Sequence, residues 1–395
     1  LGGREIRISA WWDQTPKADT EEGEKMLERI KRVEEKYNVK ITFLNTDYWE
    51  TANKVSSTVL AGEPFAEIVN LPDGFIWGLL AGGFLTPLSD YIDFANESVL
   101  PPDLIEAMKF GTNKVWAFYP PYAPNMTGLI YNKTLFEEAG LKTPQQLMDE
   151  DNWNWDTFIK VAKDAKRDTD NDGKIDTWGL SKGDLLDMAL GANETDIVNV
   201  STRKQNLEDP KVIEVFNFLA TLETEKVVRP KESDDWREPR TFFVQGNTLM
   251  YPGFMYEIGG LRNDMPDYEI GFLPFPKGPS ASTYHAIEPD MQFLTIPKVI
   301  DKPRELLYIY EKIHDIESIY DYPDQNTLET NFTDEKDIAN ARLAGENMRI
   351  TDRLQFPDMP VNEFLGELRS GVSVSTLIEK YKDQFQAAIE EVYRD

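Results

Sequence analysis

The chain has 395 residues, of which 41% are hydrophobic, so it is long and apolar enough for two or three domains with sizeable cores. Its 70 acidic and 42 basic residues give a net charge of −28, which repels phosphate backbones and anionic lipid surfaces and so argues against a nucleic-acid binder. The absence of cysteine and the presence of only two histidines exclude disulfides, thiolate nucleophiles, iron–sulfur clusters and histidine-rich metal sites.

The familiar enzyme motifs are also missing. The sequence contains no G-x-S-x-G, G-x-x-x-x-G-K-[ST] or G-x-G-x-x-G pattern, so serine hydrolases of that type and common nucleotide-binding folds are excluded. No apolar run is long enough to span a membrane. The sequence begins at Leu1 without a signal-peptide pattern, and we expect a processed product whose targeting segment has been removed.

The first seventy residues predict a β-α-β-α-β succession. The expected strands cover residues 6–12, 39–44 and 67–71, and the expected helices cover residues 26–37 and 52–60. Alternation of this kind predicts a parallel sheet with helices on its faces. Ligands bind beyond the carboxyl ends of the strands in such sheets. We therefore expect the residues that follow the three strands to lie at one edge.

The remainder of the chain contains two proline-rich connections, near residues 120–121 and 275–282, which we interpret as crossovers from one domain to the other. Strands are expected at residues 115–118, 128–131, 248–251, 268–273 and 291–296, and helices at residues 134–139, 154–167, 210–225, 304–313 and 377–392. The last helix carries an apolar stripe and is expected to pack onto the fold.

Residues 168–176 read D-T-D-N-D-G-K-I-D, the pattern of a calcium-binding loop. Hard carboxylate oxygens at positions 1, 3, 5 and 9 suit Ca²⁺, and glycine at position 6 permits the sharp turn. The expected ligands are the carboxylates of Asp168, Asp170, Asp172 and Asp176 and the backbone carbonyl of Lys174. Position 12 is Gly179 in place of glutamate, which favours a structural site over a sensor. The alternative is a solvated acidic turn.

Aromatic residues follow several of the expected strands and the first crossover, where their faces suit the flat apolar surfaces of sugar rings. The candidate ligand-binding aromatics are Trp11, Trp12, Trp49, Trp77, Tyr119, Tyr122, Phe254 and Tyr256, and the candidate acceptors of hydroxyl hydrogen bonds are Asp13, Asp73 and Asp290. We expect Trp116, Trp153 and Trp178 to belong to the core. His285 is expected to be structural, although a ligand contact is the alternative.

Four segments resemble a known family, the family 1 extracellular solute-binding proteins of bacterial ABC importers, which includes maltose-binding protein. Residues 129–141 (LIYNKTLFEEAGL) resemble its Y-N-K-x-L-F-x-x-A-G-L signature, and residues 155–158 (WDTF) resemble a helix motif. Residues 243–251 (FVQGNTLMY) resemble the F-x-x-G-x-x-A-M strand, and residues 272–278 (FLPFPKG) the crossover that follows. The likeness extends over nearly the whole chain.

This resemblance implies an α/β, two-lobed periplasmic-binding-protein-like fold of type II. Each lobe is expected to be a sheet flanked by helices, and the lobes are joined by a hinge of crossing segments. Residues 1–118 and 276–316 would form lobe 1, and residues 119–275 and 317–395 would form lobe 2, which includes the calcium loop at 168–179. The lobes are expected to close on a ligand between them.

The resemblance implies binding without catalysis, with delivery of a carbohydrate to the permease of an ABC importer. Trp12, Asp13 and Asp73 follow strands whose ends commonly contact ligand in the family, and Phe254 lies at or beside its stacking tryptophan. The calcium loop recurs in some members. We expect a monomer on the outside of the cell, as a lipoprotein of a Gram-positive bacterium whose anchor is absent from this chain, or in the periplasm.

A neutral oligosaccharide is the expected ligand class, because aromatic faces and acidic acceptors are plentiful. The candidate arginines near the proposed cleft are few (Arg237, Arg240 and Arg262), which argues against a polyanionic ligand. Three alternatives remain open. The same fold could bind a non-sugar solute such as a peptide, the chain could be a carbohydrate-active hydrolase or lyase with paired carboxylates, or it could serve a chemoreceptor or adhesion without an importer.

Overall fold

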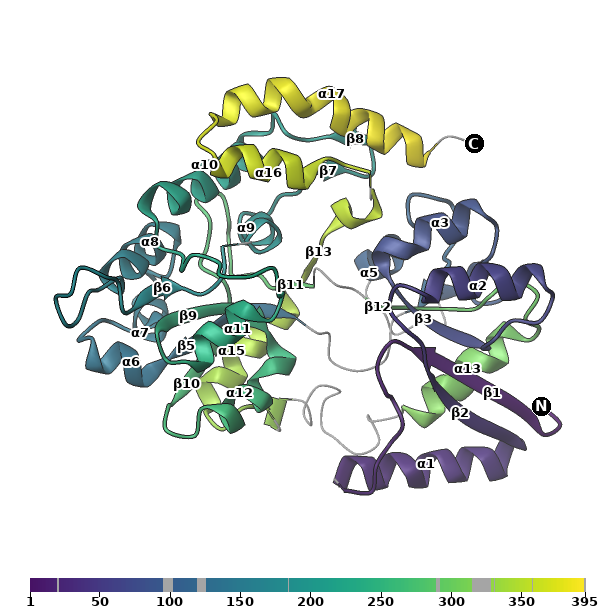
Figure 1. Ribbon diagram of the computed structural model, residues 1–395. Helices are drawn as coiled ribbons and strands as arrows, with labels where there is room; N and C mark the ends of the chain where they lie inside the picture. The colour runs from purple at the N-terminus through teal and green to yellow at the C-terminus, as the bar shows by residue number, and fades with distance from the viewer. Residues whose placement is uncertain are drawn as a thin grey trace. The chain divides into compact units, whose positions relative to one another are not determined.

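A computed structural model describes residues 1–19, 21–94, 102–118, 126–183, 185–288, 292–314, 328–329, 331–356 and 358–393 (Figure 1). The chain divides into two compact units. Unit 1 comprises Leu1–Tyr122 and Asp290–Asp324, and unit 2 comprises Ala123–Pro289 and Gln325–Asp395. Each unit has its own sheet flanked by helices, so the expected mixed α/β fold is confirmed. None of the helices within the described ranges is long and apolar enough to cross a membrane.

Unit 1 is built on a five-stranded sheet with the order β2-β1-β3-β12-β4. Its strands are β1 (Arg4–Ala10), β2 (Val39–Asn45), β3 (Ile68–Pro72), β4 (Ala117–Phe118) and β12 (Gln292–Thr295). Its helices are α1 (Glu21–Tyr37), α2 (Thr51–Leu60), η1 (Asp73–Phe75), α3 (Ile76–Ala81), η2 (Leu88–Asp90), α5 (Pro102–Ala107) and α13 (Pro303–Ile313). β1 pairs in parallel with β2 and β3, which confirms the predicted β-α-β-α-β start, whereas β12 is antiparallel to β3.

The end of β1 differs from the prediction in a way that affects the aromatic residues. The sequence predicts a strand that continues to Trp12, but β1 ends at Ala10, where it pairs with the last residue of β2, Asn45. The N–H of Thr46 then donates to the carbonyl of Ala10, at 2.9 Å, and among the described residues no partner strand continues beyond Ala10. Trp11 and Trp12 therefore lie in the loop after the strand, free of the alternation that a strand imposes.

Unit 2 is built on a four-stranded sheet with the order β10-β5-β9-β6. Its strands are β5 (Thr127–Asn132), β6 (Trp178–Leu180), β9 (Thr248–Phe254) and β10 (Ile270–Leu273), with the small pairs β7 (Val198–Asn199)–β8 (Lys204–Gln205) and β11 (Ile287–Glu288)–β13 (Arg349–Ile350). Its helices are α6 (Lys133–Glu138), α7 (Pro144–Asp149), α8 (Trp155–Asp164), α9 (Leu186–Ala192), α10 (Pro210–Glu225), α11 (Glu238–Val244), η3 (Met255–Glu257), α12 (Ile258–Asp264), α15 (Glu335–Glu346), η4 (Asp352–Gln355), α16 (Val361–Arg369) and α17 (Val374–Val392).

The predicted C-terminal helix is confirmed as part of the unit 2 core. Leu377, Tyr381 and Phe385 of α17 are buried at helical spacing, and the ring centroid of Phe385 lies 6.0 Å from that of Phe364 in α16. A helix of this length is stable in water mainly through such packing of one apolar face. The helix is therefore an integral element of the fold.

Strand β9 is longer than the sequence predicts, because it continues through Pro252 to Phe254. A proline inside a sheet is tolerated where its missing N–H has no partner to satisfy. On one side, β9 pairs with β5 through Phe254, whereas on the other side β6 pairs with it only as far as Met250. Pro252 thus lies where β9 has become an edge strand, and the strand carries Phe254 to the end of the sheet.

Residues 276–289 belong to unit 2, whereas the sequence analysis places residues from 276 onward in lobe 1. The reason is a set of contacts with unit 2. The N–H and hydroxyl of Ser282 both donate to Glu194 Oε1 at 2.6 Å, and the ring of His285 contacts Glu194 at 3.1 Å and the carbonyl of Asn347 at 2.8 Å. Strand β11 then pairs with β13. These contacts also confirm a structural role for His285.

Replacement of Glu194 is expected to weaken the attachment of this connecting segment. Hydrogen bonds from the Ser282 hydroxyl, and then from His285, lower the pKa of the Glu194 carboxyl from 4.5 to about 2. A carboxyl with a lowered folded-state pKa stabilises the fold above pH 4.5, and this stabilisation is lost as the pH falls toward 2. Glu194→Gln should reduce the free energy of unfolding at pH 7 by about 1–2 kcal/mol, as measured by urea denaturation.

The pH dependence distinguishes this ionic role from simple loss of packing. The difference between Glu194→Gln and the unmodified protein should shrink between pH 4.5 and pH 2, because in this range the unfolded state takes up a proton at Glu194 that the folded state does not. Glu63→Gln, at an exposed loop position, serves as the control and should leave the free energy unchanged. A difference for Glu194→Gln that persists undiminished near pH 2 would contradict the assignment.

Candidate functional site

Five aromatic side chains of unit 1 form a continuous set of ring contacts, which we call the aromatic cluster. Its members are Trp11, Trp12, Tyr48, Trp49 and Phe75. The ring centroids of Trp11 and Trp12 lie 4.7 Å apart, those of Trp11 and Tyr48 5.6 Å, and those of Tyr48 and Trp49 4.8 Å. Phe75 adds contacts of 5.2 Å to Tyr48 and 6.1 Å to Trp49. Every pair meets edge to face, the arrangement that aromatic quadrupoles favour.

The sheet explains why these rings meet. Trp11 and Trp12 follow β1, Tyr48 and Trp49 follow β2, and Phe75 ends η1, which follows β3. Because the three strands are parallel neighbours, their carboxyl ends lie at one edge of the sheet, where α/β folds place ligands. The prediction that Trp11, Trp12 and Trp49 share an edge is thus confirmed. The sequence analysis missed Tyr48 and Phe75, although their positions directly after strands gave the same signal.

The loop that carries Tyr48 and Trp49 is held by polar contacts. Oδ1 of Asp47 accepts hydrogen bonds from the N–H groups of Trp49 and Glu50, at 3.0 and 3.3 Å. The hydroxyl of Thr51 donates to the carbonyl of Asp47 at 2.8 Å. The buried hydroxyl of Thr46 lies 2.9 Å from that of Ser9 in β1. These bonds fix the loop on the end of the sheet, so the aromatic side chains rest on an ordered backbone.

Of the candidate carboxylates that could accept hydrogen bonds from a ligand in unit 1, the structure describes only the side chain of Asp13. Oδ1 of Asp13 accepts a hydrogen bond from the N–H of Thr15, and Lys17 lies 3.8 Å from its other oxygen. The contacts with Thr15, and then with Lys17, lower the pKa of Asp13, so it is an ionised acceptor at neutral pH. The side chain of Asp73 lies outside the described residues, as do Tyr119, Tyr122 and Asp290. Trp77 lies in α3 and is half-buried.

Unit 2 carries a second aromatic pair at the end of β9. The rings of Phe254 and Tyr256 are stacked, with centroids 5.3 Å apart and planes inclined by 24°. Tyr256 is 54% exposed. Glu257 fixes the turn, because its carboxylate accepts hydrogen bonds from the N–H of Phe254 at 3.0 Å and from the hydroxyl of Tyr251 at 2.8 Å. The predicted candidates Phe254 and Tyr256 therefore form one surface on this unit.

The tryptophans that we assigned to the core behave differently from one another. Trp153 is fully buried, and its indole N–H donates to the carbonyl of Pro274 at 3.0 Å, which confirms the prediction. Trp116 and Trp178 are only half-buried, so their assignment to the core is wrong. Trp178 lies at the sheet edge, where the ammonium of Lys166 approaches its ring to 5.2 Å. That contact is favourable for an aromatic face left partly open.

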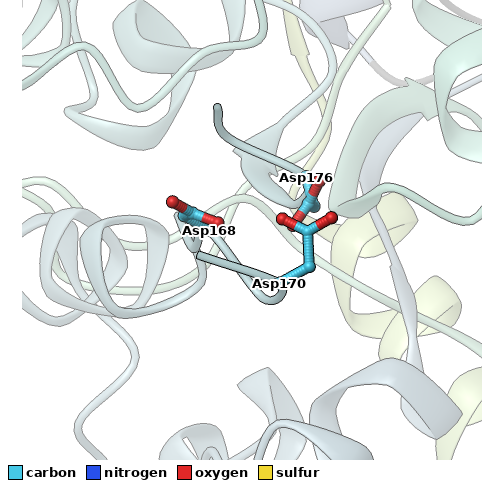
Figure 2. A group of neighbouring side chains, drawn as sticks. All are labelled: Asp168, Asp170 and Asp176. Carbon is cyan, nitrogen blue, oxygen red and sulfur yellow. The ribbon is translucent and has the colours of Figure 1, made fainter. Parts of the chain in front are cut away.

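The acidic loop follows α8 and forms a compact turn. One oxygen atom from each of Asp168, Asp170 and Asp176 lies within 4.8 Å of the others (Figure 2). Oδ2 of Asp168 accepts a hydrogen bond from the N–H of Gly173, at 2.8 Å, and Gly173 adopts a φ of 88°. A glycine is required there because other residues rarely adopt this conformation. The turn predicted at position 6 is thus confirmed, and it draws three of the predicted ligands together.

The other predicted ligands of the loop have different partners. The carboxylate of Asp172 lies 3.4 Å from the ammonium of Lys174 and is not part of the group of three. Oδ1 of Asp168 is shielded from solvent and has no hydrogen-bond partner within the part of the chain that the structure describes. Hydrogen bonds from Thr169 lower the pKa of Asp176. The site therefore offers carboxylate oxygen atoms, one of them unpartnered among the described residues, which fits the hard-ligand chemistry of Ca²⁺.

Comparisons with known proteins agree with this architecture. A model of the bacterial extracellular solute-binding protein family matches residues 17–303. The multiple sugar-binding protein of Streptococcus mutans is 21% identical over 275 residues, which cover 63% of this chain and 59% of that protein, so the match spans less than two thirds of the relative.

Solved structures extend the likeness to the whole fold. An ABC substrate-binding protein of Listeria monocytogenes in complex with cycloalternan superposes with a TM-score of 0.69 and 14% identity, covering 98% of this chain and 99% of that chain. The maltose/maltodextrin-binding domain of Bdellovibrio bacteriovorus, bound to maltotriose, gives a TM-score of 0.60 and 16% identity, with 99% and 100% covered.

Proposed function

The chain belongs to the family of bacterial extracellular solute-binding proteins, and from this premise we propose that it captures a neutral oligosaccharide without changing it chemically. The observation that carries the proposal is the aromatic cluster. Trp11, Trp12 and Trp49 are brought together at the carboxyl ends of three parallel strands. Aromatic faces at such an edge suit the apolar faces of sugar rings, and Asp13 beside them can accept hydrogen bonds from sugar hydroxyls.

The arginines support a neutral ligand. Arg237 pairs with Asp235 at 3.0 Å, Arg240 pairs with Asp264 at 2.7 Å, and Arg262 donates to the carbonyl of Asn331 at 3.2 Å. Each candidate arginine thus already has a partner within unit 2. An anionic sugar would need an unengaged cation to offset the cost of removing its carboxylate from water. The net charge of −28 adds long-range repulsion of anions.

We further propose that the acidic loop binds one structural Ca²⁺. Asp168, Asp170 and Asp176 would hold the ion, and the carbonyl of Lys174 and the carboxylate of Asp172 would complete the site. Two observations support this: the three grouped carboxylates and the unpartnered, shielded Oδ1 of Asp168. When bound, the ion supplies positive charge that relieves the repulsion between these carboxylates.

The proposal also includes a biological setting. One relative named for sugar binding, and structural neighbours that carry oligosaccharides, support delivery of the ligand to the permease subunits of an ABC importer. A monomer held outside the cell by a lipid anchor fits such a role. The main alternative ligand is a peptide, which the same aromatic surface would accommodate.

A thermal-shift screen against neutral oligosaccharides, run with calcium and with chelator, tests the function. A ligand at a hundred times its Kd should add about 2.7 kcal/mol to the free energy of unfolding and raise the midpoint by several degrees. The bound sugar should be recovered unaltered by chromatography, whereas release of reducing sugar would indicate an enzyme. A flat response to all sugars, together with a shift produced by peptides, would overturn the carbohydrate proposal.

A further inference from the structure

The aromatic cluster contains one member whose exposure stands apart. Trp49 is 74% exposed, whereas Trp11, Trp12, Tyr48 and Phe75 are all half-buried. A single exposed apolar side chain is ordinary, and Trp236 of unit 2 is exposed to a similar extent. What distinguishes Trp49 is that its exposed ring belongs to the aromatic cluster.

The position of Trp49 is fixed from two directions. Its backbone is held by the hydrogen bond from its N–H to Asp47, at 3.0 Å. Its ring meets those of Tyr48 and Phe75 at interplanar angles of 76° and 80°. Because neither neighbouring ring lies flat against the indole, most of the ring remains open to solvent while its orientation is set. A face prepared in this way loses little side-chain entropy on binding a ligand.

Trp49 is also connected, through Tyr48, to Trp11 and Trp12, which we call the inner part of the cluster. A path of ring contacts leads from Trp12 through Trp11 and Tyr48 to Trp49, with ring centroids 4.7, 5.6 and 4.8 Å apart at successive steps. Tyr48 is the central ring, since it contacts Trp11, Trp49 and Phe75. A ligand ring bound at Trp11 and Trp12 would thus have a further aromatic surface in the same cluster.

We infer that Trp49 forms an outer sugar subsite, which a ligand reaches only when it has at least one ring beyond those bound at Trp11 and Trp12. Trp49 then sets a preference for longer chains, and Tyr48 is the positioning residue that orients it. This inference rests on the proposed carbohydrate function. It adds that the ligand class is an oligosaccharide with several rings in a row.

The test compares chain lengths in one linkage series at a time. Calorimetric titrations would use maltose through maltopentaose and mannobiose through mannopentaose, with the unmodified protein and with Trp49→Ala. We expect Trp49→Ala to weaken binding of the longer members by roughly three- to tenfold, the contribution of one aromatic contact. The shortest member that binds should keep its affinity, because it does not reach Trp49.

Two further variants separate this role from a structural one. Trp49→Phe retains a flat ring and should restore most of the preference for longer chains. Trp236→Ala removes a tryptophan of unit 2 that is 77% exposed, and it should leave every titration unchanged. The difference in fluorescence between the unmodified protein and Trp49→Phe reports on Trp49. Acrylamide should quench this difference signal less when a long sugar is bound.

The outcomes are distinct. An equal loss of affinity at every chain length would overturn the inference, because Trp49 would then belong to the inner site. Unchanged affinity at every length would also overturn it and leave Trp49 as a contact for a protein partner. If neither series nor any other sugar in the screen binds the unmodified protein, the proposed carbohydrate function itself fails.

Discussion

Removal of calcium is expected to lower the unfolding midpoint of this protein by several degrees. At a hundred times its Kd, a bound ion adds about 2.7 kcal/mol to the free energy of unfolding, which corresponds to a shift of roughly 5–10 °C for a unit of this size. Asp170→Asn should abolish that response to chelator, because it removes an ionised oxygen from the group of three. Differential scanning calorimetry with and without chelator measures both effects.

The control for this experiment is Asp267→Asn, at an exposed loop position of the same unit. It changes the net charge by the same amount and should retain the full response to chelator. Without calcium, Asp170→Asn should be no less stable than the unmodified protein, since it relieves repulsion among neighbouring carboxylates. Titration of chelator-stripped protein without any uptake of calcium would show that the loop is a solvated acidic turn.

Trp12→Ala is expected to cause the largest loss of ligand affinity. Truncation of an aromatic side chain that anchors a ligand costs about 2–4 kcal/mol, or roughly 30- to 1,000-fold in Kd. Trp12 contacts Trp11 at 4.7 Å, so its loss removes a stacking face and also loosens its neighbour. Calorimetric titration with whichever oligosaccharide gives the largest shift in the thermal screen would measure the change.

Unlike Trp49→Ala, this change should weaken binding at every chain length, because Trp12 belongs to the inner part of the cluster. Trp12→Phe should recover part of the affinity, since it keeps an aromatic face of smaller area. The free energy of unfolding without ligand should change little for a half-buried loop residue. Affinity that survives Trp12→Ala would place the sugar elsewhere, with the Phe254–Tyr256 surface of unit 2 as the next candidate.

The candidate sites differ in how far the sequence could predict them. The acidic loop is local: spacing places Asp168, Asp170 and Asp176 on one turn, and Gly173 supplies the positive φ. The aromatic cluster is not local, because Trp11, Tyr48 and Phe75 come from three separate loops. The sequence indicated their shared edge through the order of strands and helices. It did not show that Tyr48 is the ring that joins the others.

The predicted ends of two strands were wrong, because the pairing with a neighbouring strand determines where each strand ends. The sequence predicted that β1 would continue to Trp12 and that β9 would end before Pro252, and both boundaries are wrong. β1 ends at Ala10 because β2 ends opposite it. β9 continues to Phe254 because β5 pairs with it that far, and Pro252 is tolerated because β6 has already ended on the other side. The assignment of Trp116 and Trp178 to the core failed for a related reason, since apolar neighbours in sequence do not determine burial.

The sequence alone determined the α/β class, the parallel start of the first sheet, the calcium-type turn and the likeness to solute-binding proteins. These features depend on residue type and short-range spacing, which the chain carries in every conformation. Only the tertiary structure decided that residues 276–289 belong to unit 2, that Glu194 holds Ser282 and His285, and that Trp49 is exposed yet fixed. Such features depend on contacts between residues far apart in the chain, whose distances are set only when the sheets and helices pack.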